Sequence, residues 1–428
     1  MAAVQRSRLF FWLAACVSLL VTARAEASEF TLEEAIQRVA KVHPQLKIFD
    51  ARRELMRAEV RAAELRPALG VGLELENVAG DAPYSGASQA EYTLTLAGVL
   101  ERGMKREARR AVAARRLDML GVERAASELD LLAEVNRRYL DVLEIASLQP
   151  QLQRASQRQQ DLANALRQRF LAGGVPEAIV LSAEAELARL NLESTQAEDI
   201  LQTRWQHLAI LWGETATPNS IPDLPTLPIK LRPLDSLPGI LEKIKLTPDI
   251  AYFASASRIH DAQLRLIESQ RSRDIQWQVG VRRLQADSST ALVAGVSVPL
   301  GQGVRADIES VAERARQRER LLERDALILR LESLLIQIYA EVRRDHQRLA
   351  LLEREILPRL QKAAEQGESA LKEGALTYSD FSYMQREWLL AERDQLTTRI
   401  AIFKNMIEMQ RLTAESWSAN GGLVGERQ

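Results

Sequence analysis

Residues 68–75 read Ala-Leu-Gly-Val-Gly-Leu-Glu-Leu, and residues 275–281 read Ile-Gln-Trp-Gln-Val-Gly-Val. In both stretches apolar residues alternate with small or polar ones, the pattern of a β-strand with one apolar face. Each stretch follows a helical run, precedes a second strand-like stretch (91–96 and 291–299) and leads into a very long helical run. Because the same order of elements recurs about two hundred residues later, the sequence predicts a duplicated architecture.

The composition favours long helices over a catalytic domain. Aromatic residues make up 5% of the 428 residues and charged residues 27%, which is typical of coiled-coil and long-helix proteins. The formal net charge of -1, with no basic face, argues against nucleic acid as a partner. We expect no catalytic residues, no cofactor and no built metal site, since none of the four histidines lies at metal-ligand spacing from another. These are His43, His207, His260 and His346.

Residues 1–25 are predicted to be an export signal, with a positive start, an apolar core of about 13 residues and an A-x-A cleavage site at 23–25. Such a core is too short to cross a bilayer as a helix, for which about 20 residues are needed. Cys16 ends a Leu-Ala-Ala-Cys box like that before a lipidated cysteine, but the apolar run continues beyond it. Cleavage near Ala25 is therefore favoured, with lipidation of Cys16 as the open alternative.

The first repeat is predicted over residues 26–212. Apolar residues recur in steps of three and four between Leu129 and Phe170, which predicts a helix-packing seam. Pro150 is expected to kink this helix, which at 1.5 Å per residue would be roughly 100 Å long. The expected elements are a helix over 31–65, a β-hairpin over about 68–100, a long helix over about 103–171 that starts at Gly103, and a return helix over about 176–212.

The second repeat is predicted over residues 239–412, after a linker at 213–238 that holds six of the fourteen prolines. A polar tail at 413–428 is expected to be flexible. The expected elements are a helix, a β-hairpin over about 274–300, a long helix over about 303–373 that starts at Gly303 and in which Pro358 echoes Pro150, and a return helix over about 376–412.

The four strands have the length of tilted membrane-crossing strands, about ten residues each. Four strands cannot close a barrel, for which about eight are needed, and an open edge in lipid leaves unpaired backbone groups. If the hairpins lie in a membrane, several chains must therefore share one barrel. The alternative is that both hairpins cap a soluble helical bundle.

Residues 30–412 resemble the TolC-type outer-membrane efflux proteins. The resemblance rests on the duplicated order of elements and on four stretches, of which residues 96–106 resemble the heavy-metal-exporting, cobalt-zinc-cadmium resistance branch. The other three are the first turn at 170–176, the second turn at 371–381 and the junction at 298–300.

This resemblance implies a mainly α-helical chain with β-hairpins that forms a homotrimer. Four strands per chain would build an outer-membrane β-barrel in contact with lipid, continued by a periplasmic α-helical barrel. The assembly would be a passive exit duct, served by an inner-membrane pump of the resistance-nodulation-division type through a periplasmic adaptor, a membrane fusion protein. Metal ions, drugs and other solutes all remain open as cargo. A periplasmic coiled-coil adaptor or scaffold without a membrane barrel is the alternative function.

The resemblance also implies site residues. Asp380 matches an aperture carboxylate of the family and is expected on the second turn of the return helix, with Tyr383 where a second carboxylate is often found. The alternative for Asp380 is a carboxylate that stabilises the helix start. Gly173, Gly174 and Gly374 are expected to reverse the backbone at positive φ where the adaptor docks.

Overall fold

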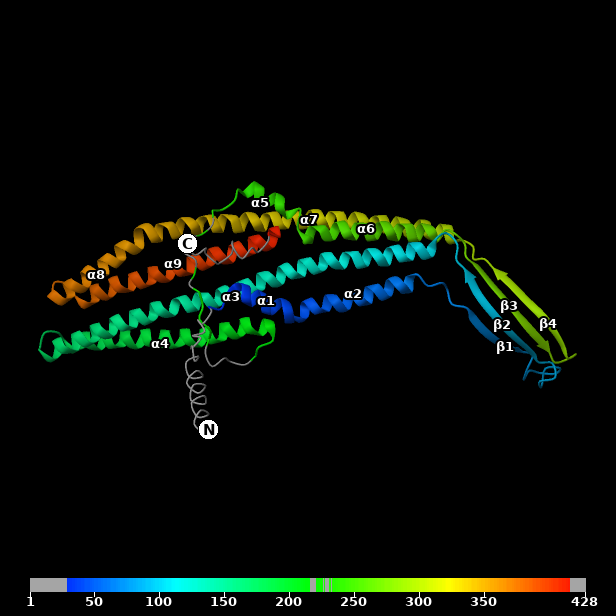
Figure 1. The fold of residues 1–428 in the computed structure, drawn as a ribbon, viewed down its shortest axis with the longest axis horizontal. Helices are drawn as coiled ribbons and strands as arrows, with labels where there is room; N and C mark the ends of the chain where they lie inside the picture. The colour runs from blue at the N-terminus through cyan, green and yellow to red at the C-terminus, as the bar shows by residue number, and fades with distance from the viewer. Residues whose placement is uncertain (1–28, 216–220, 226, 228–230, 232, 416–428) are drawn as a thin grey trace, which may run out of the picture.

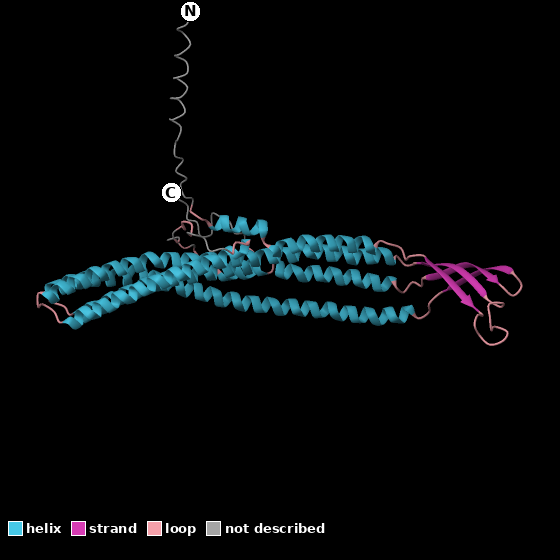
Figure 2. Cartoon of the chain, turned by 90° about the horizontal axis from the view of Figure 1, so that it is seen from below, coloured by secondary structure: helices cyan, strands magenta, loops and turns pink. Residues whose placement is uncertain are grey.

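The computed structural model describes residues 29–215, 221–225, 227, 231 and 233–415. Over these residues the chain is a long, curved bundle of helices with a β-sheet beyond one end (Figures 1 and 2). The predicted leader with Cys16, part of the linker and most of the tail lie outside the described residues. Within the described part, no helix is both long and apolar enough to cross a membrane.

The elements occur in the same order twice, which confirms the predicted mainly helical, duplicated fold with four strands. The first copy comprises α1 (Leu32–Val42), α2 (Pro44–Ala63), β1 (Gly70–Glu76), β2 (Glu91–Leu100), α3 (Lys105–Leu171), α4 (Glu177–Ala209) and the 3₁₀ turn η1 (Ile210–Trp212). The second comprises α5 (Leu237–Ile244), α6 (Pro248–Ser269), β3 (Ile275–Leu284), β4 (Ser289–Ser297), α7 (Gln302–Leu351), the π-helical segment η2 (Leu352–Ile356), α8 (Leu357–Glu373) and α9 (Tyr378–Thr413).

The helix expected over residues 31–65 is divided in two at His43. This residue has extended backbone angles (φ -58°, ψ 125°), and Pro44 begins α2. Proline disfavours helical geometry in the residue before it, yet fits the first position of a helix, where its missing N–H leaves no bond unmade. The single-helix expectation was therefore wrong, although the proline that divides it was visible in the sequence.

The long helices also differ from expectation in detail. α3 is continuous through Pro150, whereas a π-helical segment comes directly before Pro358. A π segment absorbs one extra residue near a proline that cannot donate a backbone hydrogen bond. Neither helix starts at the expected glycine: α3 follows Met104, and α7 begins at Gln302 after Gly301.

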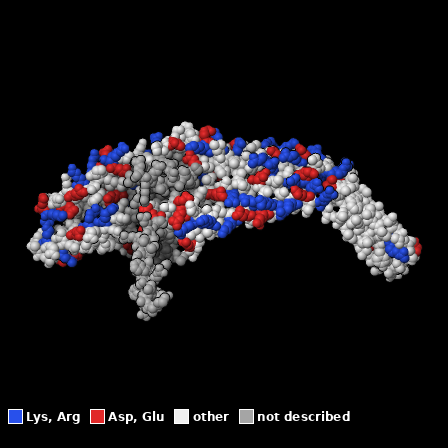
Figure 3. All heavy atoms as spheres, viewed as in Figure 1, with Lys and Arg blue, Asp and Glu red and all other residues white. Residues whose placement is uncertain are grey.

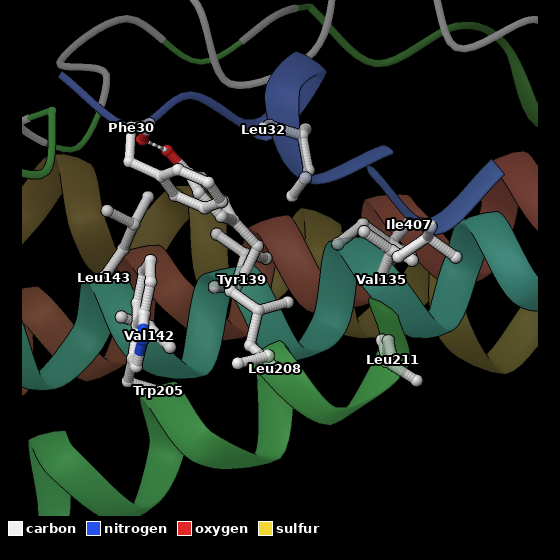
Figure 4. Packing of buried hydrophobic residues seen from close by; sticks show 14 of the residues in the cluster. Phe30, Leu32, Val135, Tyr139, Val142, Leu143, Trp205, Leu208, Leu211 and Ile407 are labelled. Carbon is white, nitrogen blue, oxygen red and sulfur yellow. Dashed lines mark hydrogen bonds between the residues drawn. The ribbon is translucent and has the colours of Figure 1, made fainter. Parts of the chain in front are cut away.

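Two hydrophobic cores lie near the middle of the molecule, where each repeat brings its short first helix against a long one. In the first core, Tyr139 donates a hydrogen bond to the carbonyl of Phe30 at 2.8 Å, and the Phe30 ring meets Trp205 edge-on at 4.9 Å (Figure 4). Leu396 and Ile400 of α9 enter this core, and Ile402 of α9 enters the second. Because α9 contributes to both cores, it fixes the two repeats to each other.

The four strands form one antiparallel sheet in the order β1-β2-β3-β4. The two predicted hairpins lie side by side because β2 pairs with β3 over its whole length, from Glu91 opposite Leu284 to Leu100 opposite Ile275. Next to the sheet, α2 packs on α3, α3 on α6 and α6 on α7, so the helices follow the same order as the strands. This arrangement places α2 with β1 at one side of the layer and α7 with β4 at the other (Figure 1).

Candidate functional site

One face of the sheet is apolar and open to the surroundings. Val71, Leu73 and Leu292 are 75%, 74% and 87% exposed. Strand register places side chains of alternating residues from all four strands on this face. Such a continuous apolar surface is far larger than scattered surface residues and marks contact with lipid or protein. The apolar residues of this face are Val71, Leu73, Leu75, Tyr92, Leu94, Leu96, Trp277, Val279, Val281, Leu292, Ala294 and Val296, and Arg283 and Thr290 follow on the same face at its loop end.

Aromatic side chains lie near both ends of this apolar face. Tyr92 is at the loop end, and Trp277, opposite Gly98, is at the helix end. Six residues of strand separate the two levels, roughly 20 Å, close to the roughly 25 Å apolar band between the aromatic girdles of membrane barrels. In Figure 3 the sheet region is almost free of charged atoms except at its tip, whereas charges cover the helices. The distribution fits a sheet that faces lipid.

The opposite face of the sheet is mostly polar or small, and its charged residues gather near the loops. Arg282 of β3 donates to Thr93 and to Glu91 on β2, each at 2.9 Å, and pairs with Glu76 on β1 at 2.9 Å. Thr93 is only 1% exposed. One guanidinium thus joins three strands, a contact that sequence reasoning missed because its partners are up to 206 residues away.

Charged groups also mark the junction between the sheet and the helices. Arg109 of α3 donates from Nη2 to Glu101 at 2.9 Å, and Lys105 pairs with Asp274 at 2.8 Å. The hydrogen bond with Glu101 raises the pKa of Arg109. These ion pairs lie directly after the ends of the strands. They therefore mark the end of the apolar band that is nearer to the helices.

Both long hairpins turn at the end of the molecule opposite the sheet, α3 into α4 and α8 into α9 (Figure 1). Gly173 and Gly374 have φ of +76° and +79°, as expected for turns that need glycine. Gly174 does not have a positive φ, so that part of the expectation was wrong. Its constraint is space, because a Cβ there would lie 3.3 Å from the carbonyl oxygen of Arg169.

Under the export function that the sequence resemblance implies, replacing Gly374 with valine is expected to reduce export while leaving membrane insertion intact. A β-branched residue at positive φ costs about 1–3 kcal/mol, and a Cβ at this position would meet no neighbour, so the effect is confined to the turn. The measurement is growth in the presence of a toxic solute, in cells that become sensitive to it when this chain is deleted and that hold the pump and adaptor implied by the resemblance. Gly374→Asn is the matched control, since asparagine tolerates this backbone region. Wild-type growth of the valine variant would contradict a docking role for the turn.

Asp380 lies in the first turn of α9, rather than on the second turn as expected. Thr377 caps this helix: its hydroxyl accepts from the backbone N–H of Asp380 at 3.2 Å and donates to the Asp380 carboxylate at 2.6 Å. This geometry matches the helix-start interpretation. Asp380 and Tyr383 are both exposed, Tyr383 to 62%. Their role in an aperture stays a prediction.

Arg169 connects the two hairpin tips. Its guanidinium donates to the carbonyl of Leu371 at 2.9 Å and to that of Lys372 at 2.6 Å. These carbonyls belong to the last turn of α8, where backbone oxygens lack helical partners and the helix dipole favours a cation. No local sequence signal could have revealed this contact, because its two sides are about two hundred residues apart.

A cavity of about 700 Å³ lies between α3, α8 and α9 and reaches the last turns of α3 and α8 at the tips. Its walls include Leu166, Leu371 and Phe381, and its rim carries charged side chains. The Arg158 guanidinium lies 4.3 Å from the centre of the Trp388 ring, and burial lowers the pKa of Arg158. The space between the two hairpins is thus an apolar groove with a charged rim.

The histidines do not come together. His260 of α6 lies 2.6 Å from Glu313 of α7, and His43 accepts from the backbone N–H of Gln45. Burial opposes ionisation of Glu313, but hydrogen bonds from His260 and Arg316 outweigh it and lower the pKa of Glu313. Among the residues that the structure describes, no three acidic, histidine or cysteine side chains are arranged to hold a metal ion.

No family model and no curated protein matches the chain. Solved structures do: CusC, which forms a transmembrane channel, is 14% identical over 90% of this chain and 92% of its own, with a TM-score of 0.74. The outer membrane protein VceC from Vibrio cholerae is 18% identical over 91% of this chain and 96% of its own, with a TM-score of 0.71. The open MtrE outer membrane channel from Neisseria gonorrhoeae is 15% identical over 91% and 89%, with a TM-score of 0.69.

These similarities define the class of fold. The chain has the fold of outer-membrane channels, which confirms at the level of fold the resemblance to TolC-type efflux proteins seen in the sequence. The heavy-metal branch, indicated by residues 96–106, stays a prediction.

Proposed function

We propose that this protein is the outer-membrane channel of a tripartite efflux system. The observation that carries the proposal is a four-stranded sheet with an apolar outer face, a polar inner face and two open edges, β1 and β4. In lipid those edges must be paired. Three copies would supply twelve strands, more than the roughly eight of the smallest membrane barrels.

The outer helices of the layer support pairing between copies. On α2, Ile48 and Leu55 are exposed and seven residues apart, and exposed Ala51 and Ala58 lie between and beyond them. This spacing is that of an unpartnered coiled-coil seam. α7 carries a matching seam of exposed apolar residues at the opposite side of the chain, comprising Val304, Ile308, Val311, Ala315, Leu322, Leu329 and Ile336.

In this assembly β1 and α2 of one copy meet β4 and α7 of the next. Each copy thus uses one edge to contact the next copy and its opposite edge to contact the previous one. Such head-to-tail contacts produce a ring when the rotation from copy to copy adds up to a full turn. The sheet then forms a barrel in the outer membrane, and the helices continue it through the periplasm. In this proposal the duct is passive, as the resemblance implies, and the energy comes from an inner-membrane pump of the resistance-nodulation-division type.

The tips are the proposed contact with the periplasmic adaptor. The apolar groove between α3, α8 and α9 suits a helix that lays its apolar face into it, and the turns at Gly173, Gly174 and Gly374 lie at its end. Asp380 and Tyr383 are the proposed aperture residues at this same end. Metal cations are the first cargo class to test, because residues 96–106 resemble the heavy-metal branch.

Membrane fractionation followed by cross-linking tests this function. We expect the protein to stay in the membrane during a wash with alkali, to need detergent for extraction and to shift in gel mobility on heating. Amine cross-linking of the detergent extract should give a ladder that ends at the trimer. Release by alkali would favour the alternative, a peripheral adaptor or scaffold, and a stable folded monomer in detergent would overturn the proposal.

A further inference from the structure

We propose that the polar face of the sheet forms a cation-selective filter at the loop end of the barrel, with Glu74 as its uncompensated charge and Arg282 as its only cation. The inference rests on the proposed function, since it needs this face to line the lumen. It concerns the strand end of the duct, far from the hairpin tips where Asp380 lies (Figure 1).

Arg282 is already committed to two carboxylates. It pairs with Glu76 and Glu91 at 2.9 Å each, and its Nε donates to Thr93. Glu91 also accepts from Asn77 at 2.9 Å. All these groups lie at the loop end of the polar face, so the single guanidinium is held there by contacts on β2 and, across it, on β1.

Glu74 lies on the same face, one rung further from the loops. Glu74 on β1 lies opposite Thr93 on β2, which in turn lies opposite Arg282 on β3. Two strand spacings of about 4.8 Å each therefore separate the backbones of Glu74 and Arg282. Glu74 is exposed and makes no hydrogen bond or ion pair within the described part of the chain. Its carboxylate therefore stays available to the lumen.

A neighbouring copy cannot neutralise Glu74 from β4. The sheet is described in full, and the polar face of β4 carries no ionisable side chain. Sliding β4 by two residues along β1 keeps its faces, so this conclusion holds in every register that keeps the apolar face outside. The residues of that polar face are Ser289, Ala291, Val293, Gly295 and Ser297.

The charge balance of the lumen face is therefore negative in any such ring. Three carboxylates against one guanidinium leave two negative charges per chain, and three copies repeat this over two neighbouring rungs at the loop end of the barrel. The field of these charges raises the local concentration of cations along the lumen face and lowers that of anions. The cargo that passes most readily through this end would be cationic.

Reversal potentials of the detergent-extracted trimer in planar bilayers, measured under a potassium chloride gradient, test the inference. We expect a cation preference that falls about twofold or more in Glu74→Gln and rises by a similar factor in Arg282→Gln. Arg282→Lys should keep the wild-type ratio because it keeps the charge. Glu59→Gln, an exposed carboxylate on α2, is the control for a helix charge outside the sheet. The differences should shrink in 1 M salt, where the Debye length is about 3 Å.

Each outcome separates the two proposals. If the wild-type trimer conducts and Glu74→Gln leaves the ratio unchanged, the filter is wrong while the channel function stands. If the wild-type protein forms no detergent-stable, heat-modifiable trimer, the proposed function itself fails. Glu74 has no partner within the described residues, so Glu74→Gln should fold; the heat-dependent gel shift verifies this for every variant.

Discussion

Arginine at Leu292 is expected to prevent assembly into the outer membrane, whereas arginine at the adjacent Val293 is expected to be tolerated. The two residues follow each other on β4 and point to opposite faces of the sheet. Leu292, which is 87% exposed, belongs to the apolar face, and Val293 belongs to the polar one. On the lipid face near mid-membrane an arginine costs about 2–4 kcal/mol, and a ring of three copies would bear that cost three times.

The amount of alkali-resistant, heat-modifiable protein in the membrane measures this difference. We expect Leu292→Arg to lower it at least tenfold, since about 1.4 kcal/mol already corresponds to a factor of ten. Val293→Arg should stay near wild type and, by adding a positive charge to the lumen, should also weaken the cation preference. Equal loss for both variants would mean that the sheet does not separate lipid from lumen.

Replacing Arg169 with an uncharged residue is expected to weaken the contact between the two hairpins at the tip of the duct. Arg169→Met keeps an unbranched, flexible side chain but loses both hydrogen bonds to the last carbonyls of α8. Hydrogen bonds to a charged group contribute about 1.5–3 kcal/mol each, so the contact between the two hairpins should weaken by at least tenfold in equilibrium terms. If widening at this end separates the hairpins, the variant should open more often.

Single-channel recording shows whether this happens. We expect a higher open probability, or a larger resting conductance, for Arg169→Met than for wild type. Arg167→Met is the matched control, because Arg167 pairs with Glu184 at 2.6 Å and so connects only α3 and α4 of one hairpin. Identical currents from both variants and wild type would show that Arg169 stabilises the tip without controlling passage.

Periodicity made much of this fold predictable. Alternation in residues 68–75 and 275–281 placed one apolar face on each hairpin, because successive strand residues point to opposite sides. Steps of three and four marked the long helices, whose packing seams depend on residues close in sequence. Because the sequence is duplicated, each pattern occurs twice and predicts the same element in both copies.

What periodicity could not predict depends on contacts between distant residues. The pairing of β2 with β3 joins the two repeats, and Arg282 and Arg169 each reach partners about two hundred residues away. Other misses were local and readable. Pro44 indicates that the first helix is divided. Thr377, three residues before Asp380, forms a capping pattern that places Asp380 in the first turn of α9.

Cross-linking between the two edge strands tests the central claim most directly. Cys16 is the only cysteine of the sequence, and cleavage near Ala25 would remove it, so cysteines placed at Leu73 on β1 and Ala294 on β4 would be the only thiols of the mature chain. With a short bis-maleimide, membranes that hold the double variant should yield a covalently closed trimer, and each single variant should yield no trimer. Co-expressed chains that carry one cysteine each, at Leu73 or at Ala294, should yield a cross-linked dimer, because each chain then offers a single thiol. A product that stays at monomer mass, or a ladder that continues beyond three chains, would contradict a closed three-copy barrel.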